Sequence, residues 1–449
     1  MKFGGSSISS DKARQIAALK VISAKEQGYQ PVVVVSAMGR KGDPYATDTL
    51  LELMDTIDPN ISPEPREVDL MLACGEIISA TTFAQLLKTL GHTALTFRGG
   101  QAGIRTDGFY CKARIVGINP ISIIQSLKQD QIPVVCGFQG LYVKGDGSPG
   151  GELTTLGRGG SDTTAAALGA ALKAEVIEIY TDVDGVKMTH PHIVKDAPTL
   201  PQMTYDEIAE LAHLGAKVLH PRAAEIAMHY HIPLWIKNTF SESKGTQIIE
   251  GENFSEQKIT GVTHTGKLIY LQFDFNNVVK IHRRLLQQHL YQLFAHFGYN
   301  LYMMDLNSEG IGFAIPRDQY PNLELLLDGI VVPIQEGKET TYLFQVGRKT
   351  SCHVTAQAKL LQGSREICVI SVKPTENCTI VSIISGEYRQ KPGIFYKVLQ
   401  VFDEAQIQVL QTSDSDYSLS CLVPESETEK AVRLMYECFG LNYSLDSGD

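Results

Sequence analysis

Short apolar runs alternate with helix-like segments through the first 250 residues, and this alternation constrains the fold more than any other feature of the sequence. The runs that we interpret as strands cover residues 31–36, 94–98, 133–138, 176–181 and 232–237. Each run follows a segment with helical character. The pattern therefore predicts parallel strands covered by helices, which is an α/β fold.

A glycine-rich loop opens onto the clearest of the predicted helices. The loop reads Gly157-Arg158-Gly159-Gly160-Ser161-Asp162, and the helix is expected over residues 163–174, which are rich in Ala and Leu. Ser161 or Asp162 is expected to cap this helix, whose first N–H groups point at whatever binds above the sheet. The arginine could hold a carboxylate through two parallel hydrogen bonds. Taken alone, the segment fits an ordinary strand-to-helix turn equally well.

A polar, aperiodic segment at residues 250–258 separates this region from a second half with a different rhythm. We therefore predict one domain over residues 1–250 and a second region over residues 259–449. The second region contains an internal repeat, because the segment ending at Pro316 lines up with the segment ending at Pro424.

An amphipathic helix precedes each copy of the repeat, at residues 278–294 and 394–402. The second region is accordingly predicted to be a tandem of small α/β modules, at about 259–340 and 366–449. Residues 320–365 fit the repeat poorly.

Composition and charge narrow the classes of function. At 449 residues, the chain has room for two to four domains of roughly 100–200 residues each. Acidic residues outnumber basic ones by 50 to 40, and no long basic run exists to meet a phosphate backbone, so we expect no nucleic-acid partner. The eight cysteines include no C-x-x-C pair and are expected to be free thiols in a reducing compartment. No apolar stretch reaches the ~20 residues of a membrane span, so we expect a cytoplasmic protein without a membrane partner.

The first motif, Lys2-Phe3-Gly4-Gly5-Ser6-Ser7, joins a lysine to paired glycines and hydroxyls. Glycines let backbone N–H groups approach a phosphate, while a lysine supplies a point charge for the β- and γ-oxygens. A Gly-Gly-Ser-Ser run is more often an ordinary turn. The sequence has no G-x-x-x-x-G-K-[ST] pattern, so a phosphate-handling function would need another fold.

Further motifs follow in a fixed order: Ser36-Ala37-Met38-Gly39 with Thr47-Asp48, Cys74-Gly75-Glu76, Gly137-Phe138, Thr181-Asp182-Val183-Asp184-Gly185, and Gly215-Ala216-Lys217-Val218-Leu219-His220-Pro221. Each alone has an ordinary structural explanation. In this order and at these separations they resemble the motifs of the aspartate kinase family, and the resemblance covers nearly all of residues 1–250. It implies the amino-acid kinase fold, a mostly parallel sheet sandwiched by helices, followed by regulatory ACT modules of βαββαβ type. The repeat in the second half resembles such a tandem less specifically.

The resemblance also implies roles for individual residues. The catalytic set would be Lys2, Lys217 and Asp162. The residues that would bind aspartate are Ser36, Thr47, Glu76, Phe138 and Arg158, with Arg158 on the α-carboxylate, Glu76 on the ammonium and Thr47 on the β-carboxylate. The residues that would bind ATP are Lys2, Gly4, Gly5, Ser6, Thr181, Asp182, Asp184, Lys187 and Lys217. Mg²⁺ is expected between the phosphate oxygens, with no separate metal site on the protein.

Two departures from the family pattern bear on nucleotide binding. Where the family usually has an Asp-Pro-Arg triplet, this chain has His190-Pro191-His192, so an arginine is replaced by an imidazole that is mostly neutral at pH 7. Lys187 or another cation could supply the lost charge. Lys2 should end the first strand, yet only Met1 precedes it, and a lysine on a frayed terminus would be poorly held.

The predicted regulatory region implies an amino-acid effector, lysine or threonine or both, and a homo-oligomer formed through the ACT modules. In the first copy Phe275-Asn276-Asn277-Val278 replaces the Pro-Gly turn of the second, so we expect the second copy to hold the effector. The candidate effector residues are Lys391, Pro392, Gly393, Ile394, Gln408, Gln411, Thr412, Ser413 and Asp414. Each of them could instead belong to a solvated sheet face.

The implied reaction is ATP-dependent phosphorylation of the aspartate β-carboxylate, the entry to lysine, threonine, methionine and diaminopimelate synthesis. Two alternatives remain open: another member of the amino-acid kinase family, and a catalytically weakened amino-acid sensor. Arg158 together with Glu76 favours a free α-amino acid over acetylglutamate, which has no ammonium to pair with Glu76.

Overall fold

The computed structural model describes residues 1–58, 61–216, 218–251, 259–307, 309–328, 330–334, 340–347, 366–386 and 393–440. The predicted site residues Lys217, Lys391 and Pro392 lie outside these ranges. The chain divides into two compact units. Unit 1 comprises Met1–Gly261 with Ile384–Gly386, and unit 2 comprises Val262–Ile383 with Glu387–Asn442.

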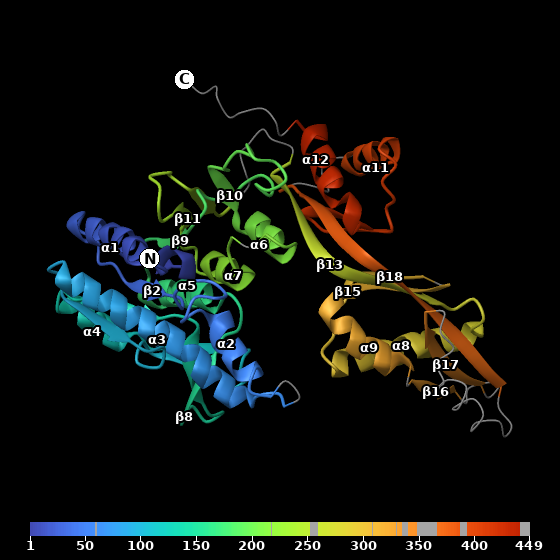
Figure 1. Cartoon of the computed structure of the whole chain (residues 1–449), viewed down its shortest axis with the longest axis horizontal. Coiled ribbons are helices and arrows are strands. Elements are labelled where there is room, and N and C mark those ends of the chain that lie inside the picture. Colours follow the sequence, from blue (N-terminus) through green and yellow to red (C-terminus); the bar gives the residue numbers. More distant parts are fainter. Residues whose placement is uncertain are drawn as a thin grey trace. The chain divides into compact units, whose positions relative to one another are not determined.

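The main sheet of unit 1 has eight strands in the order β10-β12-β11-β9-β1-β2-β6-β3 (Figure 1). Their bounds in that order are Gln202–Thr204, Thr246–Ile249, Leu234–Asn238, Ile177–Thr181, Lys2–Phe3, Val33–Val35, Ile132–Cys136 and Ala94–Phe97. All neighbours run parallel except β11 and β12. The five strands predicted from the apolar runs are therefore confirmed as β2, β3, β6, β9 and β11.

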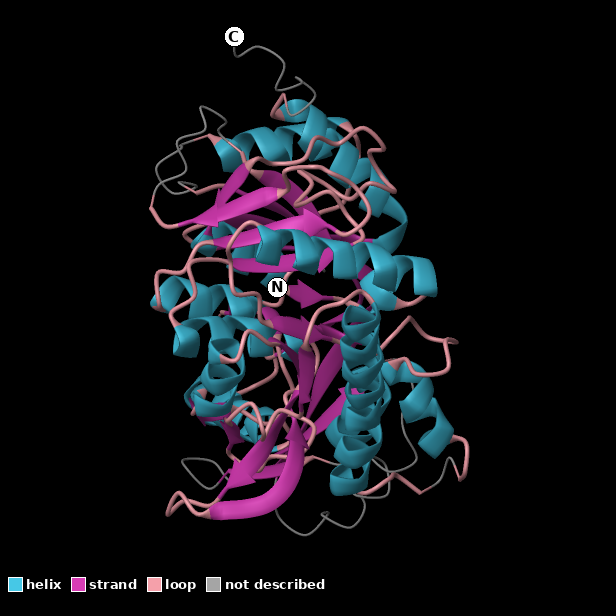
Figure 2. Cartoon of the chain, turned by 90° about the vertical axis from the view of Figure 1, so that its left-hand side faces the viewer, coloured by secondary structure: helices cyan, strands magenta, loops and turns pink. Residues whose placement is uncertain are grey.

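Helices cover both faces of this sheet (Figure 2). Phe3 packs into a core with Phe83 and the apolar faces of α1 (Asp11–Glu26) and α3 (Pro65–Thr89). The next side chain along the strand, Lys2, points to the opposite face because side chains alternate in a strand, and there it meets α5 (Gly160–Leu172). The remaining helices of unit 1 are α2 (Thr47–Asp55), α4 (Ile121–Lys128), α6 (Tyr205–His213) and α7 (Pro221–His229).

A smaller sheet in unit 1 leads into the glycine-rich loop. Its order is β5-β4-β7-β8, with bounds Ile115–Ile118, Ile104–Thr106, Gln139–Val143 and Pro149–Thr155. The last residue of β8, Thr155, stands two positions before Gly157, so this sheet fixes the start of the loop.

The cap predicted for α5 is wrong. The helix begins at Gly160, and its N-cap is Gly159 in a left-handed conformation with φ 70° and no side-chain cap. Ser161 and Asp162 lie inside the first turn instead. Glycine adopts this left-handed φ without the strain that a Cβ would cause, and the helix can therefore begin directly after Gly159. The Asp162 carboxylate is free of the capping role and pairs with Lys2.

Helix α3 is long and apolar enough to cross a membrane by length and composition, which differs from the expectation of no such segment. Half of its most apolar window is buried inside the fold, and a core helix passes the same test. Its buried residues include two carboxylates, Asp69 and Glu76. The apolar character of α3 is thus explained by packing against the sheet.

Unit 2 is built around two long neighbouring strands, β13 (Gly261–Asp274) and β18 (Glu366–Ile384). The sheet order is β14-β15-β13-β18-β17-β16, and β20 pairs with both β18 and β19. The other strands are β14 (Tyr302–Leu306), β15 (Gly310–Pro316), β16 (Val331–Ile334), β17 (Thr340–Val346), β19 (Gln411–Asp414) and β20 (Ser418–Pro424). Helices α8 (Lys280–His296) and α9 (Tyr320–Asp328) share one core with β13 and β15, and α11 (Ile394–Glu404) packs on α12 (Thr428–Cys438) (Figure 1).

The predicted repeat is confirmed in the order of its elements. The hairpins β14–β15 and β19–β20 end at Pro316 and Pro424, and each is followed by a short 3₁₀ helix and then by α9 or α12. The hairpin β16–β17 lies in the region that fitted the repeat poorly, and its first strand, β16, follows α9 as the last strand of a βαββαβ module would.

Candidate active site

Four neighbouring parallel strands end together at one edge of the main sheet. Phe3 pairs with Val35 of β2 and Tyr180 of β9, and Val35 pairs with Cys136 of β6, so the four ends are in register. The residues that follow are predicted site residues: Gly4 and Gly5, Ser36, Phe138, and Asp182. In open α/β sheets the carboxyl ends of the strands are the usual place for a ligand. The structure therefore brings together motifs that are far apart in the sequence.

Lys2 and Asp162 form an ion pair at this edge. The Lys2 Nζ lies 2.7 Å from Asp162 Oδ1, and the side chains are only 12% and 13% exposed. The other oxygen of Asp162 accepts a hydrogen bond from the backbone N–H of His220 at 3.3 Å. Because Lys2 also pairs in the ladder with Val34 and Ile179, its backbone is held in the sheet, unlike the frayed terminus that we expected.

The paired glycines allow two backbone segments to approach closely. A Cβ at Gly5 would stand 2.6 Å from the Gly39 carbonyl oxygen and 2.7 Å from that of Ala37. At Gly4 a Cβ would stand 3.5 Å from Lys2 Nζ, so the ammonium lies over this residue. Ser6 follows in a 3₁₀ helix, Gly5–Ile8. The geometry puts backbone and a cation at one point, as phosphate binding needs.

Glu76 is a buried carboxylate with one oxygen unused. The side chain is 2% exposed, and Oε1 accepts a hydrogen bond from Ala37 N at 2.9 Å. Oε2 is buried and has no hydrogen-bond partner among the described residues. Burial raises the pKa of Glu76 to about 8, although the Ala37 N–H group partly opposes this rise. A buried acceptor of this kind calls for a cationic or donor partner.

Helix α2, whose first residue is Thr47, packs against α3 at Gly75, the residue before Glu76. Gly75 allows this packing, since a Cβ there would stand 2.7 Å from Ala37 Cβ and 3.0 Å from the Tyr45 carbonyl oxygen. Thr47 is the first residue of α2 and is half-buried. Its hydroxyl is therefore on a segment that borders the Glu76 side of the sheet edge.

The glycine-rich loop leaves Arg158 exposed, and Arg158 has no ion pair within the described part of the chain. Gly157 and Gly159 on either side of it both have left-handed φ values, 76° and 70°. Phe138 lies beneath this loop with only 8% of its surface exposed, and its N–H donates to Thr164 Oγ1 at 3.1 Å. Phe138 thus supports the start of α5 more than it presents a surface to a ligand.

Two of the residues predicted on the nucleotide side, Asp182 and Asp184, already have partners within unit 1. Asp182 forms an ion pair with Arg40 and accepts a hydrogen bond from Thr181 Oγ1 at 3.2 Å. Asp184 accepts hydrogen bonds from Ser241 Oγ at 2.6 Å and Asn238 Nδ2 at 2.7 Å. These bonds hold the pKa of Asp184 below its usual value, with a small contribution from Lys187.

His190 and His192, at the place of the expected acid and arginine, stack with their ring centroids 5.2 Å apart. Sequence reasoning missed Arg40 and the part played by His220. Arg40 directly follows the motif Ser36-Ala37-Met38-Gly39, and this position could have marked it as a candidate site residue.

The described effector candidates lie in unit 2 and differ in exposure. Gly393 is the left-handed N-cap of α11, and Ile394 after it is buried in the core. Strand β19 begins at Gln411, so Gln408 precedes it. Gln411 and Thr412 are half-buried, whereas Ser413 and Asp414 are exposed.

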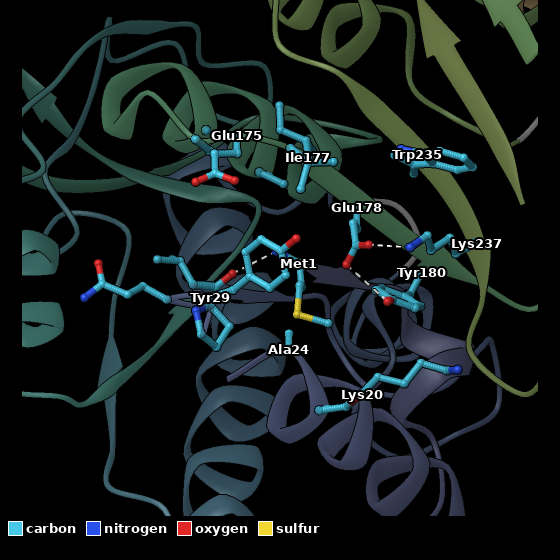
Figure 3. Close-up of a pocket in the computed structure, with 18 of the residues that line it drawn as sticks. Met1, Lys20, Ala24, Tyr29, Glu175, Ile177, Glu178, Tyr180, Trp235 and Lys237 are labelled. Atoms are coloured by element: carbon cyan, nitrogen blue, oxygen red, sulfur yellow. Dashed lines mark hydrogen bonds and ion pairs between the residues drawn. The ribbon is translucent and has the colours of Figure 1, made fainter. Parts of the chain in front are cut away.

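A cavity of about 1400 Å³ lies at the other end of the strands, beside Met1 and Glu178 (Figure 3). Glu178 pairs there with Lys237 and accepts a hydrogen bond from Tyr180 Oη at 3.1 Å. Burial raises the pKa of Tyr180, and Glu178 adds to this effect. None of the predicted site residues lines the cavity, so it is distinct from the strand-end site.

Comparisons with known proteins agree with this arrangement. The sequence model of the amino acid kinase family matches residues 1–238, and that of the ACT domain matches residues 374–437. Aspartokinase 1 of Bacillus subtilis (strain 168) is 36% identical over 447 residues, which cover 98% of each chain. An aspartokinase of Geobacillus stearothermophilus is 34% identical over 456 residues, covering 98% of this chain and 96% of the relative.

Solved structures show the same fold. Escherichia coli aspartokinase III in complex with aspartate and ADP (R-state) has a TM-score of 0.71 at 20% identity, over 97% of this chain and 98% of that chain. The same enzyme in complex with lysine and aspartate (T-state) has a TM-score of 0.68 at 19% identity, over 98% of each chain. Family models, relatives and fold agree over nearly the whole length, and the chain therefore belongs to the aspartokinases of the amino acid kinase family.

Proposed function

We propose that this kinase transfers the γ-phosphoryl group of ATP to the β-carboxylate of L-aspartate, giving 4-phospho-L-aspartate and ADP. The observation that carries the proposal is the buried Glu76 carboxylate, whose Oε2 has no partner among the described residues. It lies at the same sheet edge as the Lys2–Asp162 ion pair. A site for an ammonium group thus borders a site for phosphate.

Glu76 and Arg158 would each bind one of the two charged groups on the α-carbon of aspartate. The ammonium would pair with Glu76 Oε2, and that pairing favours the ionised carboxylate that burial alone disfavours. Arg158 would bind the α-carboxylate in a bidentate manner. Ser36 borders the same edge, and Phe138 supports it from below. The β-carboxylate would then be left beside Thr47, facing the phosphates.

The phosphoryl group would be received by groups that are already in place. Lys2 and the backbone of Gly4, Gly5 and Ser6 would hold the phosphates, and Asp162 would hold the Lys2 ammonium in position. Lys217, which lies outside the described residues, would add a second cation, as the family resemblance implies. Phosphoryl transfer relies on such positioning and charge stabilisation and needs no covalent enzyme intermediate.

The nucleotide would lie on the side of Thr181, Asp182, Asp184 and Lys187. The phosphates of ATP bound there would compete with Asp182 for Arg40, because Arg40 follows β2 and Asp182 follows β9 on either side of the β1 end. Asp162, Asp182 and Asp184 each have a partner within the protein, so Mg²⁺ would be held mainly by phosphate oxygens and water. Its chemical contribution would be to neutralise charge on those oxygens.

The effector, the oligomeric assembly, the location and the pathway are further parts of the same proposal. The ACT region would bind lysine, threonine or both and inhibit the kinase, with the second copy, which the ACT model matches, as the candidate binding site. We further propose a homo-oligomer formed through the ACT modules, a cytoplasmic location, and a place at the entry to lysine, threonine and methionine synthesis.

The test is an assay of ADP release with hydroxylamine present to trap an acyl phosphate. Aspartate should give ADP and an aspartyl hydroxamate, whereas glutamate, acetylglutamate, UMP and carbamate should give neither. Turnover with one of those acceptors and none with aspartate would replace the proposed substrate. Aspartate binding without any turnover would support the weakened sensor.

A further inference from the structure

Asp69 is a carboxylate without solvent contact in helix α3, and its hydrogen bonds all come from two other segments of unit 1. Thr155 donates to it twice, through its backbone N–H at 2.9 Å and its hydroxyl at 2.5 Å. The N–H group of Cys111 lies between its two oxygens, at 3.0 and 3.1 Å. A buried carboxylate is costly unless such donors satisfy it, so Asp69 holds both segments firmly against α3.

These two segments form the base of the glycine-rich loop. Thr155 ends β8, and Arg158 follows three residues later. On the other side, Cys111 has a left-handed φ of 62°, and its carbonyl oxygen would lie 3.1 Å from a Cβ at Gly157. Ala113 N also donates to the Thr155 carbonyl oxygen at 2.9 Å. Asp69 therefore holds both the end of β8 and the segment at Cys111, which packs against the start of the loop.

The same helix carries Glu76. Residues seven apart are two helical turns apart and share one face, with a separation of about 10 Å along the axis. One rigid helix thus supports the proposed ammonium site through Glu76 and the base of the arginine loop through Asp69. The distance between these two sites is set by α3 and by the hydrogen bonds of Asp69.

We propose that Asp69 is a positioning residue for substrate recognition: it holds the loop so that Arg158 stands at the distance from Glu76 that an α-amino acid requires. This inference rests on the proposed placement of aspartate between Glu76 and Arg158. Asp69 touches no substrate, and its effect passes through Thr155 and the loop. Weakening the hydrogen bonds between Asp69 and Thr155 should therefore raise the KM for aspartate and leave the KM for ATP unchanged.

The chain offers a matched pair of variants on one strand. Thr155→Val removes the hydroxyl that Asp69 accepts from, while Thr154→Val removes the neighbouring hydroxyl, which pairs with Thr106 Oγ1 at 2.6 Å. Both threonines are fully buried, but Thr155→Val removes a hydrogen bond to a carboxylate and should cost more stability than Thr154→Val, so thermal unfolding is compared for the two variants. Thr155→Ser keeps the hydroxyl and should restore the parent behaviour. These variants avoid Asp69→Asn, which places an amide against the donors and can prevent folding.

The experiment measures KM for aspartate, KM for ATP, kcat and thermal unfolding of the full chain. We expect Thr155→Val to raise the aspartate KM by about tenfold, a loss within the range that a hydrogen bond to a charged group can contribute, with the ATP KM within about twofold. Thr155→Ser and Thr154→Val should keep the parent aspartate KM.

Equal effects of Thr155→Val and Thr154→Val would overturn the positioning role and reduce Asp69 to a structural one. Arg158→Ala serves as the reference for the proposed function itself. If Arg158→Ala raises the aspartate KM and Thr155→Val does not, only the inference about Asp69 fails. If Arg158→Ala leaves the aspartate KM unchanged, the proposed substrate site fails and the inference fails with it.

Discussion

The two units bury their polar groups differently. Within the described residues, the buried carboxylates are Asp69, Glu76 and Glu207, and all three belong to unit 1. The buried polar side chains of unit 2 are hydroxyls and the imidazole of His282. Burying a carboxyl group without hydrogen-bond partners costs far more than burying a hydroxyl, and in unit 1 these groups cap a helix, hold a loop or border the proposed ligand site.

The carboxylates of unit 1 also differ from one another. Glu207 completes a capping box with Thr204 through Oε2, and its other oxygen accepts a hydrogen bond from Thr260. Both oxygens of Asp69 are likewise engaged, Oδ1 by the Thr155 hydroxyl and Oδ2 by the Thr155 N–H group. Glu76 alone among the three has a buried oxygen without a partner in the described part of the chain. Among these three carboxylates, the unused oxygen of Glu76 distinguishes the proposed ligand site from the two structural positions.

The largest effect is expected from the ion pair at the carboxyl ends of the strands. Lys2→Met should lower kcat by about 100- to 1000-fold, because the ammonium stabilises charge that develops during phosphoryl transfer. Lys237→Met is the matched control, since Lys237 forms another partly buried ion pair, with Glu178, that includes none of the predicted site residues. The control should lose stability without losing kcat. Similar losses of kcat in both variants would show that the effect is structural.

Inhibition through unit 2 is the next effect in size. Lysine, threonine or their mixture should weaken the apparent affinity for a substrate by about 5- to 150-fold, the range of a coupling free energy of ~1–3 kcal/mol. Steady-state kinetics of the full chain with Gln411→Ala as the test variant measures this coupling. The effector assignment would be abandoned if millimolar lysine and threonine, alone or together, changed neither the kinetics nor the heat of binding.

The ionisation of Glu76 should make aspartate binding depend on pH. Its pKa of about 8 lies above the ordinary value of 4.5, so the free enzyme holds an extra proton at neutral pH. An ammonium ligand needs the ionised form, and the aspartate KM should therefore fall by up to about tenfold per pH unit as the pH rises toward 8. Because the folded protein holds this proton more tightly than the unfolded chain, the free energy of unfolding should fall as the pH rises from 4.5 to about 8. Glu76→Gln should remove both dependences.

The smallest effect is expected where unit 2 buries a neutral pair. The hydroxyls of Ser382 and Ser420 lie 2.7 Å apart, and both side chains are buried. Ser382→Ala should lower the free energy of unfolding by about 1 kcal/mol, the usual net value of such a hydrogen bond. The kcat and KM values without effector should stay at those of the parent. Chemical denaturation and steady-state kinetics test the two halves of this prediction.

Much of the site could be predicted because its signals are local. Each motif is a short stretch of sequence, and the motifs that contain Gly4, Ser36, Phe138 and Asp182 were recognised by their resemblance to a known family. The strands predicted at 31–36 and 133–138 included Ser36 and Phe138, whereas the structure ends both strands earlier and places these two residues just beyond the strand ends. The internal repeat was visible for the same reason, since each copy carries its own helix, hairpin and proline.

The contacts that could not be predicted join distant parts of the sequence. Arg40 and Asp182 are 142 residues apart, and Asp69 and Thr155 are 86 residues apart. No local sequence pattern predicts such pairs, because each partner alone is an ordinary polar residue. The start of α5 was misplaced since the sequence does not reveal that Gly159 adopts a left-handed φ. In each case tertiary packing decided the outcome.

The most direct test of the proposed site is the KM for aspartate, compared with the KM for ATP, in Glu76→Gln and Arg158→Ala. Removing one partner of a desolvated ion pair costs ~2–5 kcal/mol, so each change should raise the aspartate KM by at least about thirtyfold and leave the ATP KM within about twofold. An unchanged aspartate KM in both variants would contradict the placement of the substrate between Glu76 and Arg158.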